Sequence, residues 1–261
     1  MDFSRSEGWK IRNGEEEDKS LKIKRKSDIL VDNMVQRDEI SEKVAEFLRA
    51  GKCEVAKYYH LVKTNKILTD IDNPENWLME NGYPLRGIVS GIGTPTERIS
   101  GFVDYFLQPG MQSLGSFLKD GKHTLQIVEE INDKIESGET TLDGVALVSL
   151  DIESMYNNMS EDLGTSAAKE FLESRDCQKD GNPCSVSTES MLEALDLCLK
   201  SSFFKFNEKL YKQVGVLGTG LQLAPTYACL GMGKYENLVF TSDQQLLDKI
   251  VIYISTHKTF K

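Results

Sequence analysis

The chain has 261 residues, 39% of them hydrophobic and 28% charged, which is long enough for one large or two small domains and excludes wholesale disorder. Its formal net charge of −10 excludes a uniformly basic nucleic-acid-binding protein. The acidic residues are concentrated in one region, however. The segment from Gln126 to Asp196 contains 17 Asp/Glu and 4 Lys/Arg, whereas the segment from Lys200 to Phe240 contains 5 Lys and 2 Glu. The overall charge therefore does not exclude a polyanionic ligand at one face.

Cysteine and histidine usage bears on metals and on the compartment. There are five cysteines and three histidines, with no CxxC pair and with the histidines far apart in the sequence. This pattern predicts reduced, structural thiols and argues against a zinc site. No apolar segment is long enough to span a bilayer and the charged N-terminus does not resemble a signal peptide, so we expect no membrane partner and an intracellular location, nuclear or cytoplasmic.

The N-terminal segment, residues 1–27, alternates acidic and basic runs and carries few large apolar groups. We expect a charged, disordered tail, because such a segment buries too little surface to offset its chain entropy. Its KIKRK run is either a nuclear-import or phosphate-contacting patch or simply a solvated stretch. A helical apolar pattern follows from Ile29 to Leu48 and is broken by Gly51.

Two short strands are predicted next, at Tyr58 to Val62 and at Gly87 to Ser90. Three basic side chains lie at or near the ends of these strands: Lys63, Lys66 and Arg86.

The TPTE sequence predicts a helix start with a capping box, in which Thr94 is the N-cap, Pro95 the first helical residue and Glu97 the partner. Apolar residues at helical spacing make this a core-facing helix that stops at Pro109-Gly110. A second amphipathic helix is predicted to end at Ser137-Gly138.

The stretch GVALVSLDIESMY, which begins at Gly144, combines a continuous apolar run with a carboxylate at its end. The run is typical of a strand buried on both faces, and Asp151 follows where a sheet opens to ligand. Such an aspartate should be solvated, paired or bound to a metal. The alternative is that Asp151 caps a helix or a turn.

The remaining elements follow in order. A helix should start at Ser160, another should run from Thr188 to Leu199, and Phe203 to Phe206 with Leu210 to Val214 should form a hairpin. A glycine-rich loop then leads into a helix rich in small residues that opens at Ala224-Pro225. Small residues there indicate a close approach to the backbone, either by another part of the protein or by a ligand.

Three segments in this order, PLRGIVSGIGTPTE, SLDIESMYNNM and QVGVLGTGLQLAPTYA, resemble the fingers, motif A and motif B of reverse transcriptases. The pattern is most similar to that of Penelope-like retroelements, and the likeness runs from about Lys57 to Glu236. It implies RNA-directed DNA synthesis on an RNA/DNA primer-template with deoxynucleoside triphosphates.

The resemblance also assigns roles to residues. It makes Asp151 the catalytic carboxylate that binds Mg²⁺, with the Ile152 carbonyl as a second ligand, and it makes Tyr156 the gate beneath the incoming sugar. Arg86 resembles the fingers arginine that clamps the triphosphate, with Lys63 or Lys66 assisting. Gly220 and Pro225 match the loop and helix start over which template and nucleotide pack. Phosphoryl transfer needs oxygen-ligated Mg²⁺ and a cationic clamp, which agrees with these residue types.

The chain also departs from the family pattern. Val216, Thr219 and Cys229 stand in place of a glycine, a methionine and an asparagine of motif B, so nucleotide selection by that helix is expected to differ. The two adjacent aspartates of motif C are missing, because no Asp-Asp pair occurs in the 261 residues. We therefore expect this polypeptide alone to be inactive, unless another acid such as Glu153 or Glu236 completes the metal site.

The sequence thus predicts an α/β (α+β) fold, a partial right-hand polymerase. We expect a tail over 1–27, N-terminal helices and fingers over 28–140, and an incomplete palm over 141–261. The function expected is that of a reverse transcriptase domain fragment of a retroelement. The alternatives are a catalytically dead nucleic-acid-binding or interaction module and an unrelated α/β domain.

Overall fold

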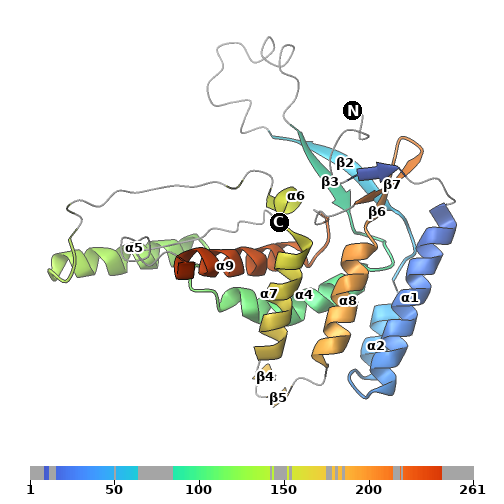
Figure 1. The fold of residues 1–261 in the computed structure, drawn as a ribbon, viewed down its shortest axis with the longest axis horizontal. Coiled ribbons are helices and arrows are strands. Elements are labelled where there is room, and N and C mark those ends of the chain that lie inside the picture. Colours follow the sequence, from blue (N-terminus) through green and yellow to red (C-terminus); the bar gives the residue numbers. More distant parts are fainter. Residues whose placement is uncertain are drawn as a thin grey trace, which may run out of the picture.

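A computed structural model describes residues 9–11, 16–49, 51–63, 85–141, 143, 152, 155–174, 178–179, 182–183, 186–213, 218 and 220–242. Within these ranges the chain combines a mixed β-sheet with a body of packed helices, which confirms the predicted α+β composition. Figure 1 shows the sheet at one end of the helical body.

The main sheet has five strands in the order β1-β7-β6-β2-β3. Its strands are β1 (Trp9–Ile11), β2 (Ala56–Val62), β3 (Leu85–Ser90), β6 (Phe203–Phe206) and β7 (Lys209–Gln213). All neighbours are antiparallel except β2 and β6, which are parallel. The strands predicted at Tyr58 to Val62 and at Gly87 to Ser90 and the predicted hairpin are confirmed. The two turn residues of that hairpin, Asn207 and Glu208, both have positive φ, as a two-residue turn between twisted strands requires.

One face of the sheet carries a small aromatic core of its own. Phe204 is fully buried, stacks on Tyr211 with ring centroids 5.3 Å apart, and lies 5.3 Å from the ring of Tyr58. The register explains this cluster, because Phe204 is paired with both Ala56 and Tyr211, and paired residues point to the same face. Two very short strands, β4 (Gln178–Lys179) and β5 (Asn182–Pro183), form a separate pair.

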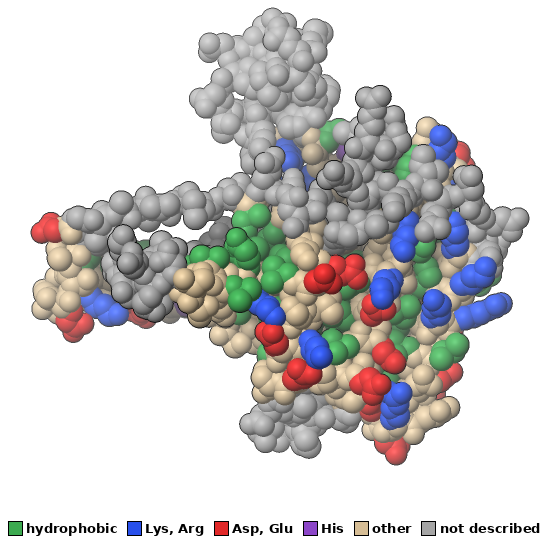
Figure 2. Space-filling view, in the orientation of Figure 1, with side chains coloured by type: hydrophobic (Ala, Val, Ile, Leu, Met, Phe, Trp, Pro, Cys, Tyr) green, Lys and Arg blue, Asp and Glu red, His purple; other side chains and the backbone are tan. Residues whose placement is uncertain are grey.

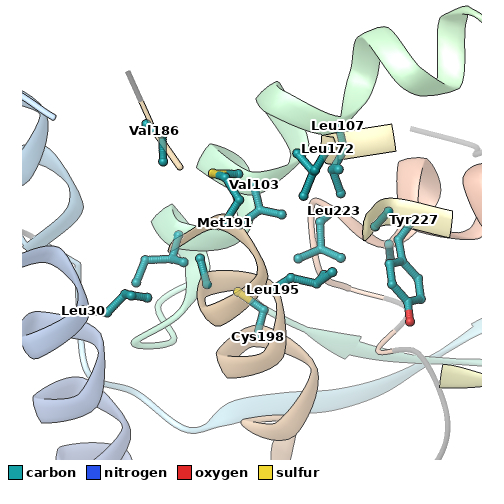
Figure 3. Packing of buried hydrophobic residues seen from close by; sticks show 14 of the residues in the cluster. Leu30, Val103, Leu107, Leu172, Val186, Met191, Leu195, Cys198, Leu223 and Tyr227 are labelled. Atoms are coloured by element: carbon teal, nitrogen blue, oxygen red, sulfur yellow. The ribbon is translucent and has the colours of Figure 1, made fainter. Parts of the chain in front are cut away.

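The helical body holds the larger core. Its helices are α1 (Glu16–Gln36), α2 (Glu42–Arg49), α4 (Glu97–Gln112), α6 (Met155–Asn158), α7 (Glu161–Ser174), α8 (Thr188–Lys200) and α9 (Ala224–Ser242). Side chains from α1, α4, α7, α8 and α9 meet in one cluster, and Figure 3 shows Met191 and Leu195 of α8 between Leu30 on one side and Leu223 and Tyr227 on the other. The starts predicted for α7, α8 and α9 are confirmed.

The predicted N-terminal tail is wrong for residues 16–27, which form the first half of α1. The core-facing positions of this half are taken by Ser20 and Ser27, both buried, so the segment has too few apolar residues to show a helical pattern. Ser27 Oγ donates a hydrogen bond to Pro95 O at 3.3 Å. Within the KIKRK run, Arg25 and Lys26 are exposed and Lys24 pairs with Asp28, which both alternatives for this run allow.

The start and end predicted for α4 need correction. Its N-cap is Thr96, not Thr94, and no side-chain hydrogen bond caps it. Thr94 Oγ1 instead donates to Gly91 O at 2.7 Å, and Glu97 Oε2 accepts from Gly93 N at 2.8 Å, so the TPTE residues form a turn before the helix. The helix continues through Pro109 to Gln112. Pro109 lies in its last turn, where the missing N–H removes only one helical hydrogen bond.

Helix α5 (Gly121–Glu136) extends away from the sheet (Figure 1). It ends before Ser137 and Gly138 as predicted, and Gly138 has φ of 76°. The helix is amphipathic, but no side chain on its apolar face is buried, and Leu125 is 65% exposed.

Candidate functional site

The segments that carry the fingers and motif B resemblance are joined backbone to backbone. Ser90, the last residue of β3, forms a parallel bridge with Gly220. The N–H of Gly91 donates to Gly220 O at 3.2 Å. The glycine-rich loop is therefore hydrogen-bonded to the end of β3, although the two are about 130 residues apart in sequence.

The start of α9 is held by polar side chains of α4. The backbone N–H of Leu223 donates to Ser100 Oγ at 3.1 Å, and Thr226 Oγ1 donates to Asp104 Oδ1 at 2.5 Å. Pro225 is half-buried as the second residue of the helix, where its missing N–H costs no helical hydrogen bond. These hydrogen bonds fix the direction in which α9 leaves the glycine-rich loop.

The pKa of the Tyr156 hydroxyl is set mainly by burial and to a lesser extent by two side chains on other elements. Burial raises the pKa of the Tyr156 hydroxyl, a negative charge on Cys229 would raise that pKa further, and the positive charge of Arg86 lowers it. Tyr156 is half-buried in α6, Arg86 is exposed on β3, and Cys229 is buried in α9. Burial raises the pKa of the Cys229 thiol to about 12, so Cys229 is a neutral neighbour at physiological pH.

The small residues of the loop and of α9 are explained by intramolecular packing. A Cβ on Gly220 would lie 1.8 Å from Val89 O, one on Gly231 2.7 Å from Met159 Sδ, and one on Gly233 2.5 Å from Leu114 Cδ2. Of the two alternatives that the sequence left open, the structure supports close approach by other parts of the protein at these three positions.

Some residues that the resemblance assigns fall outside the described ranges. These are Asp151, Lys66, Val216 and Thr219. Consequently, the expected strand before Asp151 and the distance from Asp151 to the glycine-rich loop remain predictions. Of the other assigned residues, Ile152 is 44% exposed and Lys63 is half-buried directly after β2.

The described residues contain no group of three His, Cys, Asp or Glu side chains that could hold a metal ion. Glu236, one of the two acids considered for completing such a site, is buried and accepts a hydrogen bond from Ser116 Oγ at 2.8 Å. The other, Glu153, lies outside the described ranges. The described residues thus do not support a metal site at Glu236, and the expectation of Mg²⁺ still depends on Asp151.

Two polar residues that lie near the glycine-rich loop and the start of α9 were not identified from the sequence. Asp104 supports α9 from α4, and Gln213 is 4% exposed at the end of β7. The sequence did mark Gln213 as unusual, because it is a polar residue between a predicted strand and the glycine-rich loop. Asp104 gave no such signal, because a lone aspartate on an amphipathic helix is normally exposed.

Comparisons of the chain with protein-family models, with curated proteins and with solved structures find no match. Among the residues described, no helix has the length and apolarity needed to cross a membrane. In Figure 2, basic side chains gather at the right of the molecule, over α1, and acidic and basic side chains are mixed over the lower part of the helical body.

Proposed function

We propose that this chain is a reverse-transcriptase-related module of a retroelement, similar to those of Penelope-like elements, that binds an RNA/DNA primer-template. The observation that carries the proposal is the parallel bridge between Ser90 and Gly220, which joins two of the three resembling segments although they are far apart in the chain. Met159, the last residue of the segment that resembles motif A, packs against Gly231 of α9 and supports the same arrangement.

Each of these groups suits a role in holding a nucleotide. The Arg86 guanidinium, exposed on β3, offers a planar set of donors that matches phosphate oxygens. The ring of Tyr156 is half-buried against the core, which fixes it as a platform for a sugar. In the proposed module the Asp151 carboxylate and the Ile152 carbonyl would hold Mg²⁺, which supplies charge stabilisation in phosphoryl transfer.

A second candidate function is nucleic-acid binding without synthesis. The observation that favours it is that the 261 residues contain no Asp-Asp pair. Two metal ions roughly 4 Å apart need more than one carboxylate, so Asp151 alone cannot complete the site. We therefore expect binding, but no nucleotide incorporation, from the 261-residue chain on its own.

The proposal is tested by the salt dependence of binding to an RNA/DNA primer-template. We expect weak association, at roughly micromolar Kd or weaker, that falls steeply as salt rises, because each phosphate that the protein neutralises releases counterions. Replacing Lys63, Lys66 and Arg86 together by Ala should reduce the magnitude of the slope of log K against log salt, by about one for each phosphate that is no longer neutralised.

The matched control is Lys43→Ala. Lys43 is exposed on α2, which Figure 1 shows at the end of the helical body remote from the sheet, so its removal should leave the slope unchanged. If the triple variant and Lys43→Ala behave alike, Lys63, Lys66 and Arg86 are merely solvated and the proposal loses its support.

A further inference from the structure

A small cavity lies between the sheet and the helical body. It has a volume of about 20 Å³. Its walls come from β2, β3, the turn before α4, the start of the β6–β7 hairpin and the glycine-rich loop. A cavity needs about 10 to 15 Å³ to hold one water molecule, so this one has room for a water molecule.

The cavity is lined by buried polar side chains that could bind a water molecule. Gln213 is 4% exposed, and its Oε1 is buried without a hydrogen-bond partner among the described residues. Thr96 is 4% exposed, and its hydroxyl does not cap α4. Ser202 also lines the cavity and is 9% exposed. The end of a glutamine side chain is polar whichever way the carboxamide is turned, so it needs a partner here in either orientation.

The surrounding backbone holds Gln213 in this position. Its N–H donates to Ser202 O at 2.9 Å, which closes the hairpin. A Cβ on Gly218 would lie 3.1 Å from Gln213 Oε1, so the side chain is enclosed by the loop on that side. Because leaving a buried polar atom without a partner costs about 1 to 3 kcal/mol, this site favours occupation by a water molecule.

We propose that one ordered water molecule binds in this cavity and links Gln213 Oε1 to the hydroxyl of Thr96. The water donates one hydrogen bond to Gln213 Oε1 and accepts one from Thr96 Oγ1, and Ser202 offers a third partner. The link joins β7 to the N-cap of α4, and therefore joins the sheet to the helical body. It does not depend on the proposed function.

A crystal structure of the whole chain, at a resolution that shows ordered water, tests the proposal directly. The expected result is a single density peak in the cavity, at about 2.7 to 3.2 Å from Gln213 Oε1. A cavity without density, or a Gln213 side chain bonded to another protein group, would overturn the proposal.

A double-mutant cycle tests the same link in solution by urea unfolding. We expect Gln213→Met and Thr96→Val each to raise the unfolding equilibrium constant about tenfold, and the double variant to raise it by clearly less than the product, because the first substitution already releases the water. Purely multiplicative effects would contradict a shared water. Gln36→Met, at an exposed glutamine of α1, is the control and should change the constant less than about threefold.

Discussion

Replacing Gly220 by Ala should destabilise the protein by about 3 kcal/mol or more. The added Cβ would lie 1.8 Å from Val89 O and 2.7 Å from Val89 C. Both atoms belong to the backbone of β3, so no side chain can move aside, and the strand and the loop must separate. Separation also breaks the hydrogen bond from Gly91 N to Gly220 O. The free energy of unfolding, measured by urea titration with a circular dichroism signal, gives the effect.

Gly51→Ala is the matched control, because a Cβ there meets nothing within 4 Å. It should change stability by no more than about 0.5 kcal/mol. The comparison also separates the two explanations of the glycine-rich loop. If Gly220 served only to admit a ligand, Gly220→Ala would fold as stably as the unsubstituted chain when no ligand is present, and the packing explanation would be wrong.

Gly164→Ala should also destabilise the chain, where α7 packs against α9. A Cβ on Gly164 would lie 2.3 Å from both Cε1 and Cζ of Tyr227. The Tyr227 ring cannot withdraw, since the residue is 1% exposed and its hydroxyl is bonded to Thr165 Oγ1 and to Glu161 O, at 3.0 and 2.8 Å. Alanine gains about 1 kcal/mol in helix propensity, but overpacking of this severity costs about 3 kcal/mol, so we expect a net loss of about 2 kcal/mol.

Two further variants identify the cause of that destabilisation. Tyr227→Leu should be less harmful in the Gly164→Ala background than in the native one, by about 1 kcal/mol or more, because it removes the ring that the new methyl group meets. Gly121→Ala, at an open position in the first turn of α5, should be neutral or slightly stabilising. Equal stability of Gly164→Ala and the unsubstituted chain would show that α7 and α9 can move apart freely.

Local patterns predicted most of the described elements correctly. The strands at Tyr58 and Gly87, the β6–β7 hairpin and the starts of α7, α8 and α9 follow from alternation, helical spacing and cap residues. The errors have physical causes. In the first half of α1, buried serines occupy positions where apolar residues are expected, so the helical pattern in the sequence is weak. The helix forms there because it packs against the rest of the protein. The cap expected at Thr94 is wrong because α4 begins at Glu97, and Thr94 lies in the turn before it, where its hydroxyl donates to Gly91 O.

The candidate site was predictable only in part. The motif order pointed to Arg86, Tyr156 and the glycine-rich loop. The segments of Arg86 and of the loop meet at the Ser90–Gly220 bridge, and the segment of Tyr156 packs against α9 through Met159. The neighbour of each glycine could not be predicted, because the sequence shows a glycine whether a strand, a side chain or a ligand packs against it. The buried Oε1 of Gln213 likewise depends on the cavity beside it, which no local pattern encodes.

Site-specific photo-crosslinking tests the central claim, that nucleic acid binds where the three resembling segments meet. A benzoylphenylalanine introduced in place of Tyr156 should crosslink to a labelled RNA/DNA primer-template, and excess unlabelled duplex should abolish the crosslink. The same photoreactive residue in place of Tyr235, which is 53% exposed in the second half of α9, should crosslink little or not at all. Crosslinking at position 235 without crosslinking at position 156 would contradict the account, because it would place the nucleic acid away from Arg86 and Tyr156.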